Sequence, residues 1–211
     1  MLMPLFIAFE GGEGSGKSTQ ITLLHQHLVE SDCPVFATHE PGATSVGKAI
    51  RSLLLETDEQ ISPRSEALLF AADRAHHVET EIRPKLAAGQ HVLCDRYVDS
   101  SIAYQGAGRT LSTDEIAALS NWATQGLLPD LTVLLDIAPE QGLARVGDRT
   151  RLAGPDRLER EQLAFHERVR DGFLRLAHQD PDRYLILDAT RPVAELAVDI
   201  AAEVRRRLAI E

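Results

Sequence analysis

The sequence has few cysteines and no long apolar run. Only two of its 211 residues are cysteines, Cys33 and Cys94, and they show neither a pairing pattern nor the spacing of a metal site. This argues against a disulfide scaffold, and we expect a reducing compartment, the cytoplasm. No apolar stretch approaches the roughly 20 residues of a membrane-spanning helix, and the first residues lack the basic segment of a signal peptide. We therefore expect no membrane association.

Positive charge is also scarce. The 22 Lys and Arg residues stand against 32 Asp and Glu residues, a net charge of −10. A nucleic-acid surface needs a basic face, so the composition disfavours a nucleic-acid partner. A compact anionic ligand stays open, because a local cluster of arginines can outweigh the overall balance. The sequence lacks internal repeats and linkers, and its length predicts a single α/β domain over residues 1–211.

A glycine-rich stretch follows the first apolar run, residues 5–9. Four of its residues match the spacing G-x-x-x-x-G-K-[ST]: Gly11, Gly16, Lys17 and Ser18. In this motif backbone N–H groups and the start of the following helix hold phosphate groups, the lysine reaches the outer phosphates, and the hydroxyl takes a place on Mg²⁺. A glycine-rich turn that matches by accident is the alternative, but the strand before it and the helical spacing after it favour a P-loop. The stretch predicts a nucleoside triphosphate site.

Apolar runs of strand length recur along the chain, separated by longer segments with helical spacing. They lie at residues 5–9, 35–37, 91–94, 131–137 and 184–187. This alternation predicts an α/β fold of the P-loop NTPase type, a doubly wound parallel five-stranded sheet with helices on both faces. Ligands of such folds bind at the carboxyl ends of the strands. Besides the P-loop, three groups lie at such ends: Glu40-Pro41-Gly42, Asp95-Arg96-Tyr97 and Asp136.

A long helix is predicted from Ser62-Pro63 to about residue 88, because a serine cap followed by proline is typical of a helix start. Phe70 and Arg74 are four residues apart and share a face of this helix. Taken alone, the pair fits a core phenylalanine with a solvated arginine. The adjacent histidines, His76-His77, have no partner at ligand spacing, and we expect them on the surface.

Two further segments have both a structural and a functional interpretation. If the stretch after Tyr97 is helical, Ser101, Tyr104 and Gln105 fall on one side, either as boundary residues or as a site beside the P-loop. The place of this stretch after a strand favours the site. Between residues 145 and 160, five arginines flank the helix breaker at 153–155: Arg145, Arg149, Arg151, Arg157 and Arg160. These arginines could form a solvated face or a flap that closes over phosphates. We favour the flap, because guanidinium groups suit phosphoryl oxygens.

Taken together in order, these motifs resemble the thymidylate kinase family, nucleoside monophosphate kinases that phosphorylate dTMP to dTDP with ATP. The matching segments cover nearly the whole chain: Phe9-Glu10-Gly11, Glu40-Pro41-Gly42, Asp95-Arg96-Tyr97, Tyr104-Gln105, Asp156-Arg157-Leu158-Glu159 and Asp188-Ala189-Thr190. The variable P-loop positions 12–15 carry no basic residue, whereas the lid, about residues 147–158, carries arginines, as in the bacterial type. Two features depart from the family: Ala43 replaces a glycine, and the lid is one residue longer than expected.

The resemblance implies roles for individual residues. Phe70 would stack on thymine, Arg74 and Ser101 would bond its polar edge, and the remaining acceptor residues would hold the sugar and phosphate. The implied dTMP-binding residues are Glu13, Glu40, Pro41, Phe70, Arg74, Arg96, Ser100, Ser101, Tyr104 and Gln105. The implied ATP-binding residues are Gly11, Gly12, Glu13, Gly14, Ser15, Gly16, Lys17, Ser18, Thr19, Arg145 and Arg191, the last two near adenine.

The resemblance also implies a catalytic set, a metal and an assembly. The catalytic residues would be Lys17, Arg96, Arg149, Arg151 and Arg157, with Mg²⁺ held by Ser18 and through Asp95. The extra lid residue leaves open which lid arginine touches the transferring phosphate. A homodimer is implied, and the predicted helices at 64–88 and 100–107 offer apolar faces for it. No general base is needed, because a phosphate monoester, with its second pKa at about 6, is already a nucleophile.

Two other functions stay open at this point. Another nucleoside monophosphate kinase is the runner-up, because the P-loop alone does not select the acceptor. A nucleotide-dependent switch is the alternative from another class. A GTPase switch should carry an Asn-Lys-x-Asp run for guanine, and the sequence contains none.

Overall fold

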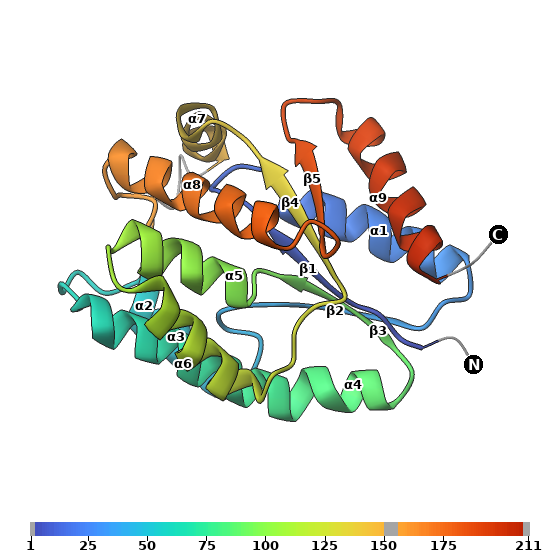
Figure 1. The fold of residues 1–211 in the computed structure, drawn as a ribbon, viewed down its shortest axis with the longest axis horizontal. Helices are drawn as coiled ribbons and strands as arrows, with labels where there is room; N and C mark the ends of the chain where they lie inside the picture. Colours follow the sequence, from blue (N-terminus) through green and yellow to red (C-terminus); the bar gives the residue numbers. More distant parts are fainter. Residues whose placement is uncertain (1–2, 150–155, 209–211) are drawn as a thin grey trace.

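The computed structural model describes residues 3–149 and 156–208, and Figure 1 shows their arrangement. A five-stranded sheet with the order β2-β3-β1-β4-β5 forms the centre. Its strands are β1 (Phe6–Glu10), β2 (Val35–His39), β3 (His91–Asp95), β4 (Leu131–Asp136) and β5 (Tyr184–Asp188). All neighbouring strands pair in parallel. The predicted strands and parallel sheet are confirmed.

Helices cover both faces of this sheet. They are α1 (Lys17–Glu30), α2 (Ser45–Leu55), α3 (Pro63–His77), α4 (Arg83–Ala87), α5 (Val98–Ser101), α6 (Thr113–Thr124), α7 (Pro139–Arg149), α8 (Leu163–Gln179) and α9 (Val193–Leu208). Two π-helical segments join them, η1 (Val78–Ile82) and η2 (Ile102–Gly108). In Figure 1, α1 and α9 lie together on one side of the sheet, and α3 to α6 lie on the other with α8.

Alternate residues of the strands supply the two cores. Ile7 and Phe9 pack against apolar residues of α1 and α9. Phe6 and Ala8, which point to the opposite face, pack against residues of η1 and α5. Because successive side chains of a strand face opposite ways, a strand covered on both sides must be apolar at every position. This explains the continuous apolar run of residues 5–9.

The predicted long helix is present, with a local widening. Ser62 caps it by accepting a hydrogen bond from the backbone N–H of Ser65, and Pro63 is its first residue. The chain continues from α3 through η1 and α4 to Ala87 without leaving the helical region, close to the predicted end. Across residues 3–149 and 156–208, none of the helices has the length and apolar character to cross a membrane.

The topology puts the candidate residues at one edge. β1 lies between β3 and β4, and in the register of the sheet Phe9 is opposite Asp95. The chain leaves β1 into the P-loop, while Arg96 follows β3 directly. The P-loop therefore meets the residues after β3 at the carboxyl edge of the sheet, as expected for this class of fold.

Candidate active site

The P-loop, residues 11–18, has the backbone that a phosphate cradle requires. Gly11 and Gly14 have φ values of 136° and 66°, in the region that favours glycine. A Cβ atom at Gly11 would also collide with the carbonyl oxygen of Leu135, and one at Gly14 with that of Gly142. Both glycines are therefore needed for the loop to lie this close to the residues around β4 and α7.

Lys17 folds back over the loop that precedes it. Its Nζ atom donates to the carbonyl oxygens of Gly11 and Gly12, at 3.1 Å each. Burial, assisted by the nearby charge of Arg96, lowers the pKa of Lys17 to about 8. The ammonium group thus lies inside the cradle, where a phosphate oxygen would replace carbonyl oxygens as its acceptor.

The cleft beside the P-loop has a volume of about 650 Å³. Its lining combines residues of the P-loop and α1 with residues at or just after the ends of β2 and β3, and one residue of α2: Glu13, Gly14, Ser15, Gly16, Lys17, Ser18, Thr19, Ile21, Thr22, Ala37, Thr38, His39, Glu40, Arg51, Asp95 and Arg96. The Ser18 hydroxyl donates to Asp95 Oδ2 at 2.8 Å. A hydroxyl and a carboxylate are oxygen donors of the kind that Mg²⁺ prefers, so the predicted metal pair fits that ion.

A second pocket of about 200 Å³ adjoins this cleft. It is lined by Glu13, Glu40, Pro41, Arg51, Leu55, Phe70, Arg96, Ser100, Ser101, Tyr104, Gln105, Asp156, Leu158 and Glu159. Every residue predicted to bind the acceptor is among them except Arg74. Glu13, Glu40, Arg51 and Arg96 line both spaces. The structure therefore brings the predicted acceptor residues together in one pocket next to the P-loop cleft.

Arg96 lies where the two spaces meet. Its φ of 66° is unusual for a residue other than glycine, and such backbone strain is concentrated at functional sites. Its guanidinium donates to the Gly11 carbonyl at 3.0 Å and to Glu13 Oε1 at 2.8 Å, and it stacks 4.9 Å from the centre of the Tyr104 ring. Burial opposes ionisation of Glu13, but the charges of Arg96 and Lys17 outweigh it and lower the pKa of Glu13 to about 2.

Glu10 binds the segment that directly follows Arg96, a role that the sequence did not predict. Its carboxylate is fully buried and accepts from the backbone N–H groups of Tyr97 and Ser100 at 2.8 and 3.1 Å. It also accepts from the Ser100 hydroxyl at 2.6 Å. Burial, followed by repulsion from Asp99, raises the pKa of Glu10 to about 7. The signal in the sequence was an acidic residue at the end of an otherwise apolar strand.

Arg74 and His77 differ from the simplest expectations. Arg74 is only 2% exposed and donates to Glu40 Oε2 at 2.7 Å, so it is not a solvated arginine. His77 is fully buried, and the predicted surface pair of histidines is wrong for it. The physical reason is the Glu40 carboxylate, which turns inward and needs donors on both oxygens.

The lid arginines divide into different groups. Arg145, in α7, donates to the carbonyl oxygens of Ala189 and Gly14, so it joins the P-loop to the segment after β5, and its predicted place beside adenine stays a prediction. Arg191, on that segment, pairs with Asp199 at 2.8 Å. The side chain of Arg149 is not described, and Arg151 lies outside the described residues.

Arg157 lies elsewhere. It pairs with the buried carboxylate of Glu66 and donates to the Leu54 carbonyl at 2.7 Å. Glu66, in α3, also accepts from Gln105 and Arg109, at 3.0 Å each. This cluster fastens residues 156–159, part of the acceptor pocket wall, to α3. The predicted catalytic role of Arg157 stays a prediction, and Glu66 had no signal in the sequence.

The fold and site can be compared with known proteins. A family model described as thymidylate kinase matches residues 9–200. The chain belongs to the thymidylate kinase family. Among its thymidylate kinase relatives, that of Clavibacter michiganensis is 53% identical over 208 residues, which cover 97% of this chain and 96% of the relative. The thymidylate kinase of Deinococcus radiodurans is 49% identical over 207 residues, which cover 98% of this chain and 99% of the relative.

A solved thymidylate kinase supports the same assignment. The crystal structure of the enzyme from Ehrlichia chaffeensis superimposes with a TM-score of 0.76 at 30% identity, covering 95% of this chain and 98% of that one. The predicted resemblance to thymidylate kinases is confirmed, and with it the nucleoside monophosphate kinase type of P-loop fold. The relatives named here are bacterial, as the P-loop and lid composition predicted.

Proposed function

We propose that this chain transfers the γ-phosphoryl group of ATP to dTMP and so forms dTDP for the synthesis of dTTP and DNA. One observation carries the proposal: a P-loop cleft and a smaller pocket meet at Arg96, and the smaller pocket contains the predicted acceptor residues. Membership of the thymidylate kinase family supports the choice of dTMP over other monophosphates.

The donor, ATP, lies in the P-loop cleft in this proposal. Backbone N–H groups and Lys17 hold its phosphates, and Arg145 with the segment around Arg191 holds adenine. Ser18 and Asp95 would hold Mg²⁺, which would supply positive charge to the donor phosphates. Support comes from the oxygen donors of the metal pair and from the contact of Arg145 with both the P-loop and Ala189.

The acceptor, dTMP, fills the smaller pocket. Phe70 is half-buried and lines the pocket, so its ring is available to stack on the base. Tyr104 is held beside Glu13 by a hydrogen bond of 2.6 Å and limits the space around the sugar. Arg96 holds the acceptor phosphate at the boundary with the donor cleft. Catalysis then comes from alignment of the two phosphates and from positive charge, with Arg149 and Arg151 as further contributors from the lid.

The assembly and compartment are also proposals. We propose a single functional domain over residues 1–211 and a cytoplasmic homodimer without nucleic-acid or membrane partners. In the predicted helix at 100–107, Ala103 and Tyr104 are buried against α8 within this chain, so these two residues do not offer an apolar face to a second copy. Leu68 in α3 and Trp122 in α6 are 58% and 78% exposed and offer apolar surface for a second copy. Measurement of the molar mass in solution tests this proposal.

A coupled assay of ADP release tests the proposed reaction. The enzyme receives ATP, Mg²⁺ and one monophosphate at a time: dTMP, dUMP, dCMP, dGMP, AMP or UMP. We expect dTMP to react best and dUMP to react measurably, because a missing methyl costs only about 1–3 kcal/mol in an apolar pocket. The others should be poor. Equal turnover of UMP or AMP would replace the proposal with another nucleoside monophosphate kinase, and slow ATP hydrolysis without any acceptor response would favour a switch.

A further inference from the structure

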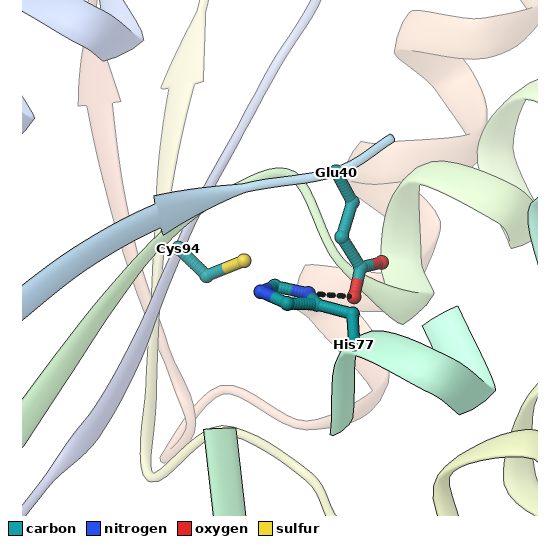
Figure 2. Close-up of side chains that lie close together, drawn as sticks. All are labelled: Glu40, His77 and Cys94. Carbon is teal, nitrogen blue, oxygen red and sulfur yellow. Dashed lines mark hydrogen bonds and ion pairs between the residues drawn. The ribbon is translucent and has the colours of Figure 1, made fainter. Parts of the chain in front are cut away.

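Three potential metal ligands, from β3, the end of α3 and the residue after β2, lie close together, as Figure 2 shows. Glu40, His77 and Cys94 are buried, and their ligand atoms lie within 4.8 Å of one another. A metal would need free lone pairs and a deprotonated thiol. However, both Glu40 oxygens already accept hydrogen bonds, and burial raises the pKa of the Cys94 thiol well above its usual range. The cluster is therefore poorly suited to a metal, and its hydrogen bonds need another explanation.

The cluster belongs to a chain of hydrogen bonds. His77 Nδ1 lies 2.9 Å from Glu40 Oε1, and His77 Nε2 lies 2.7 Å from the Thr38 hydroxyl. Because an ionised carboxylate can only accept, Nδ1 carries the hydrogen and donates to Glu40. In the neutral ring with its hydrogen on Nδ1, Nε2 accepts from the Thr38 hydroxyl. These two bonds fix the tautomer and the orientation of the His77 ring.

The series of hydrogen bonds continues from Glu40 to the acceptor pocket. Glu40 Oε2 accepts from Arg74 Nε at 2.7 Å. Arg74 in turn donates to the Ser101 hydroxyl at 3.0 Å and to the Tyr97 carbonyl at 2.9 Å. Glu40 and Ser101 line the pocket, whereas Arg74 lies behind them. The hydrogen bonds of His77 thus end at two polar groups that face the proposed position of the base.

We propose that His77 is a positioning residue for base recognition: by holding Glu40 it fixes Arg74 and Ser101, and thereby the polar pattern that the pocket presents to the edge of the base. This inference rests on the proposed function, because it requires dTMP in this pocket. Without His77, Glu40 Oε1 loses its donor in a buried site, and the carboxylate is free to turn away from Arg74.

A second buried carboxyl group, Asp73, interacts electrostatically with both Glu40 and Arg74. Asp73 is also buried, and its Oδ2 atom has no hydrogen-bond partner. Burial and the charge of Glu40 raise the pKa of Asp73 to about 6. If Glu40 turned away, this group would become a competing acceptor near Arg74. The hydrogen bonds from His77 and Arg74 hold one Glu40 oxygen each and so oppose such a rotation.

Loss of this base-reading arrangement would change the choice among monophosphates, which a general loss of stability would not. dTMP and dUMP present the same polar edge and differ in a methyl group, whereas dCMP presents a different edge. Displacement of the polar groups of Arg74 and Ser101 should therefore reduce the preference for dTMP over dCMP. The preference for dTMP over dUMP should not change, because none of these hydrogen bonds involves a group that would contact the methyl group.

The experiment compares two isosteric variants at His77. His77→Asn keeps an N–H group near the position of Nδ1, and His77→Gln keeps one near Nε2 only. His76→Gln, a half-buried neighbour on α3, is the matched control. The measurements are kcat and KM with dTMP, dUMP and dCMP, KM for ATP, and the thermal midpoint. We expect His77→Gln to raise KM for dTMP about tenfold, the effect of losing one hydrogen bond to a charged group, with kcat within about threefold and KM for ATP unchanged.

In His77→Gln the ratio of kcat/KM for dTMP over dCMP should also fall about tenfold, His77→Asn should recover most of the loss, and the control should resemble the wild type. An unchanged ratio in a folded His77→Gln, or equal behaviour of the Asn and Gln variants, would overturn the proposal. ¹⁵N NMR of the wild-type imidazole tests it without any variant: a hydrogen on Nε2 instead of Nδ1 contradicts it. Failure of the proposed function is a separate result, because the wild type would then not phosphorylate dTMP.

Discussion

Arg96 and Glu13 form an ion pair of 2.8 Å at the boundary between the P-loop cleft and the smaller pocket. The two residues are 83 positions apart in the chain, and each lines both spaces. Glu13 belongs to the loop that would hold the donor, and Arg96 is the group proposed to hold the acceptor phosphate. The donor loop therefore helps to set the position of the acceptor arginine, and the roles of the two sides can be separated by mutation.

Lys17→Ala and Arg96→Ala should impair different substrates. Each removes a charge-assisted contact of roughly 1.5–3 kcal/mol, which corresponds to about 10- to 100-fold in affinity or rate. Lys17→Ala should weaken ATP and Arg96→Ala should weaken dTMP. Separate titrations with each nucleotide check this. Normal dTMP affinity and turnover in Arg96→Ala would place the acceptor site elsewhere.

The lid arginines should act on rate more than on binding. In the proposed mechanism Arg149 and Arg151 contact the transferring group mainly in the transition state, so their loss appears in kcat. Replacement of both by alanine should lower kcat by about 100-fold or more, with a smaller change in KM for ATP. Arg160→Ala is the control, because Arg160 pairs only loosely with Asp58, at 3.7 Å. A loss of ATP affinity with unchanged kcat would make these arginines a clamp.

Phe70 should supply affinity without selecting the base. Every base offers a flat face for stacking, so Phe70→Leu should raise KM for dTMP, dUMP and dCMP by similar factors, equivalent to about 0.5–1.5 kcal/mol. Steady-state kinetics with the three monophosphates measure this. A loss confined to dTMP would show that Phe70 reads the methyl group instead of the ring face.

Glu66 should matter for stability. Its carboxylate is fully buried and neutralises Arg109 and Arg157 together. Glu66→Ala leaves Arg157 without its carboxylate partner in a largely buried site and leaves Arg109 paired with Glu161 alone, so it should lower the free energy of unfolding by about 3–5 kcal/mol. Glu195→Ala, which breaks the exposed pair with Arg191, should change it by only about 0–1 kcal/mol. Denaturant titration of the two variants compares them, and equal losses would contradict the assigned role of Glu66.

The low pKa of Glu13, about 2, predicts a dependence of stability on acid pH. The carboxyl loses its proton more readily in the folded chain than in the unfolded chain, so its contribution is complete above about pH 4.5 and is lost as pH falls toward 2. Between pH 5 and 3 the wild type should lose on the order of 1–3 kcal/mol more stability than Glu13→Gln. Urea titrations at both pH values test the difference, and parallel losses would show that Arg96 does not stabilise the Glu13 charge.

The sequence determined the features that depend on local pattern. Apolar runs of strand length and the helical spacing between them predicted the sheet, because a strand covered on both faces must be apolar throughout. The P-loop was visible for a similar reason, since its glycines, lysine and serine lie within eight consecutive residues. The order of the strand-end motifs then sufficed to predict the family.

Only the tertiary structure decided which polar side chains are buried together. His77 was expected on the surface, yet it lies beneath Glu40, 37 residues away in the chain. Glu66 gave no signal, yet it pairs with Arg157 across 91 residues. Periodicity records which face of a helix is apolar, but it does not record which distant charge that face will meet. A buried charge is stable only with its partner, and the fold alone brings such partners together.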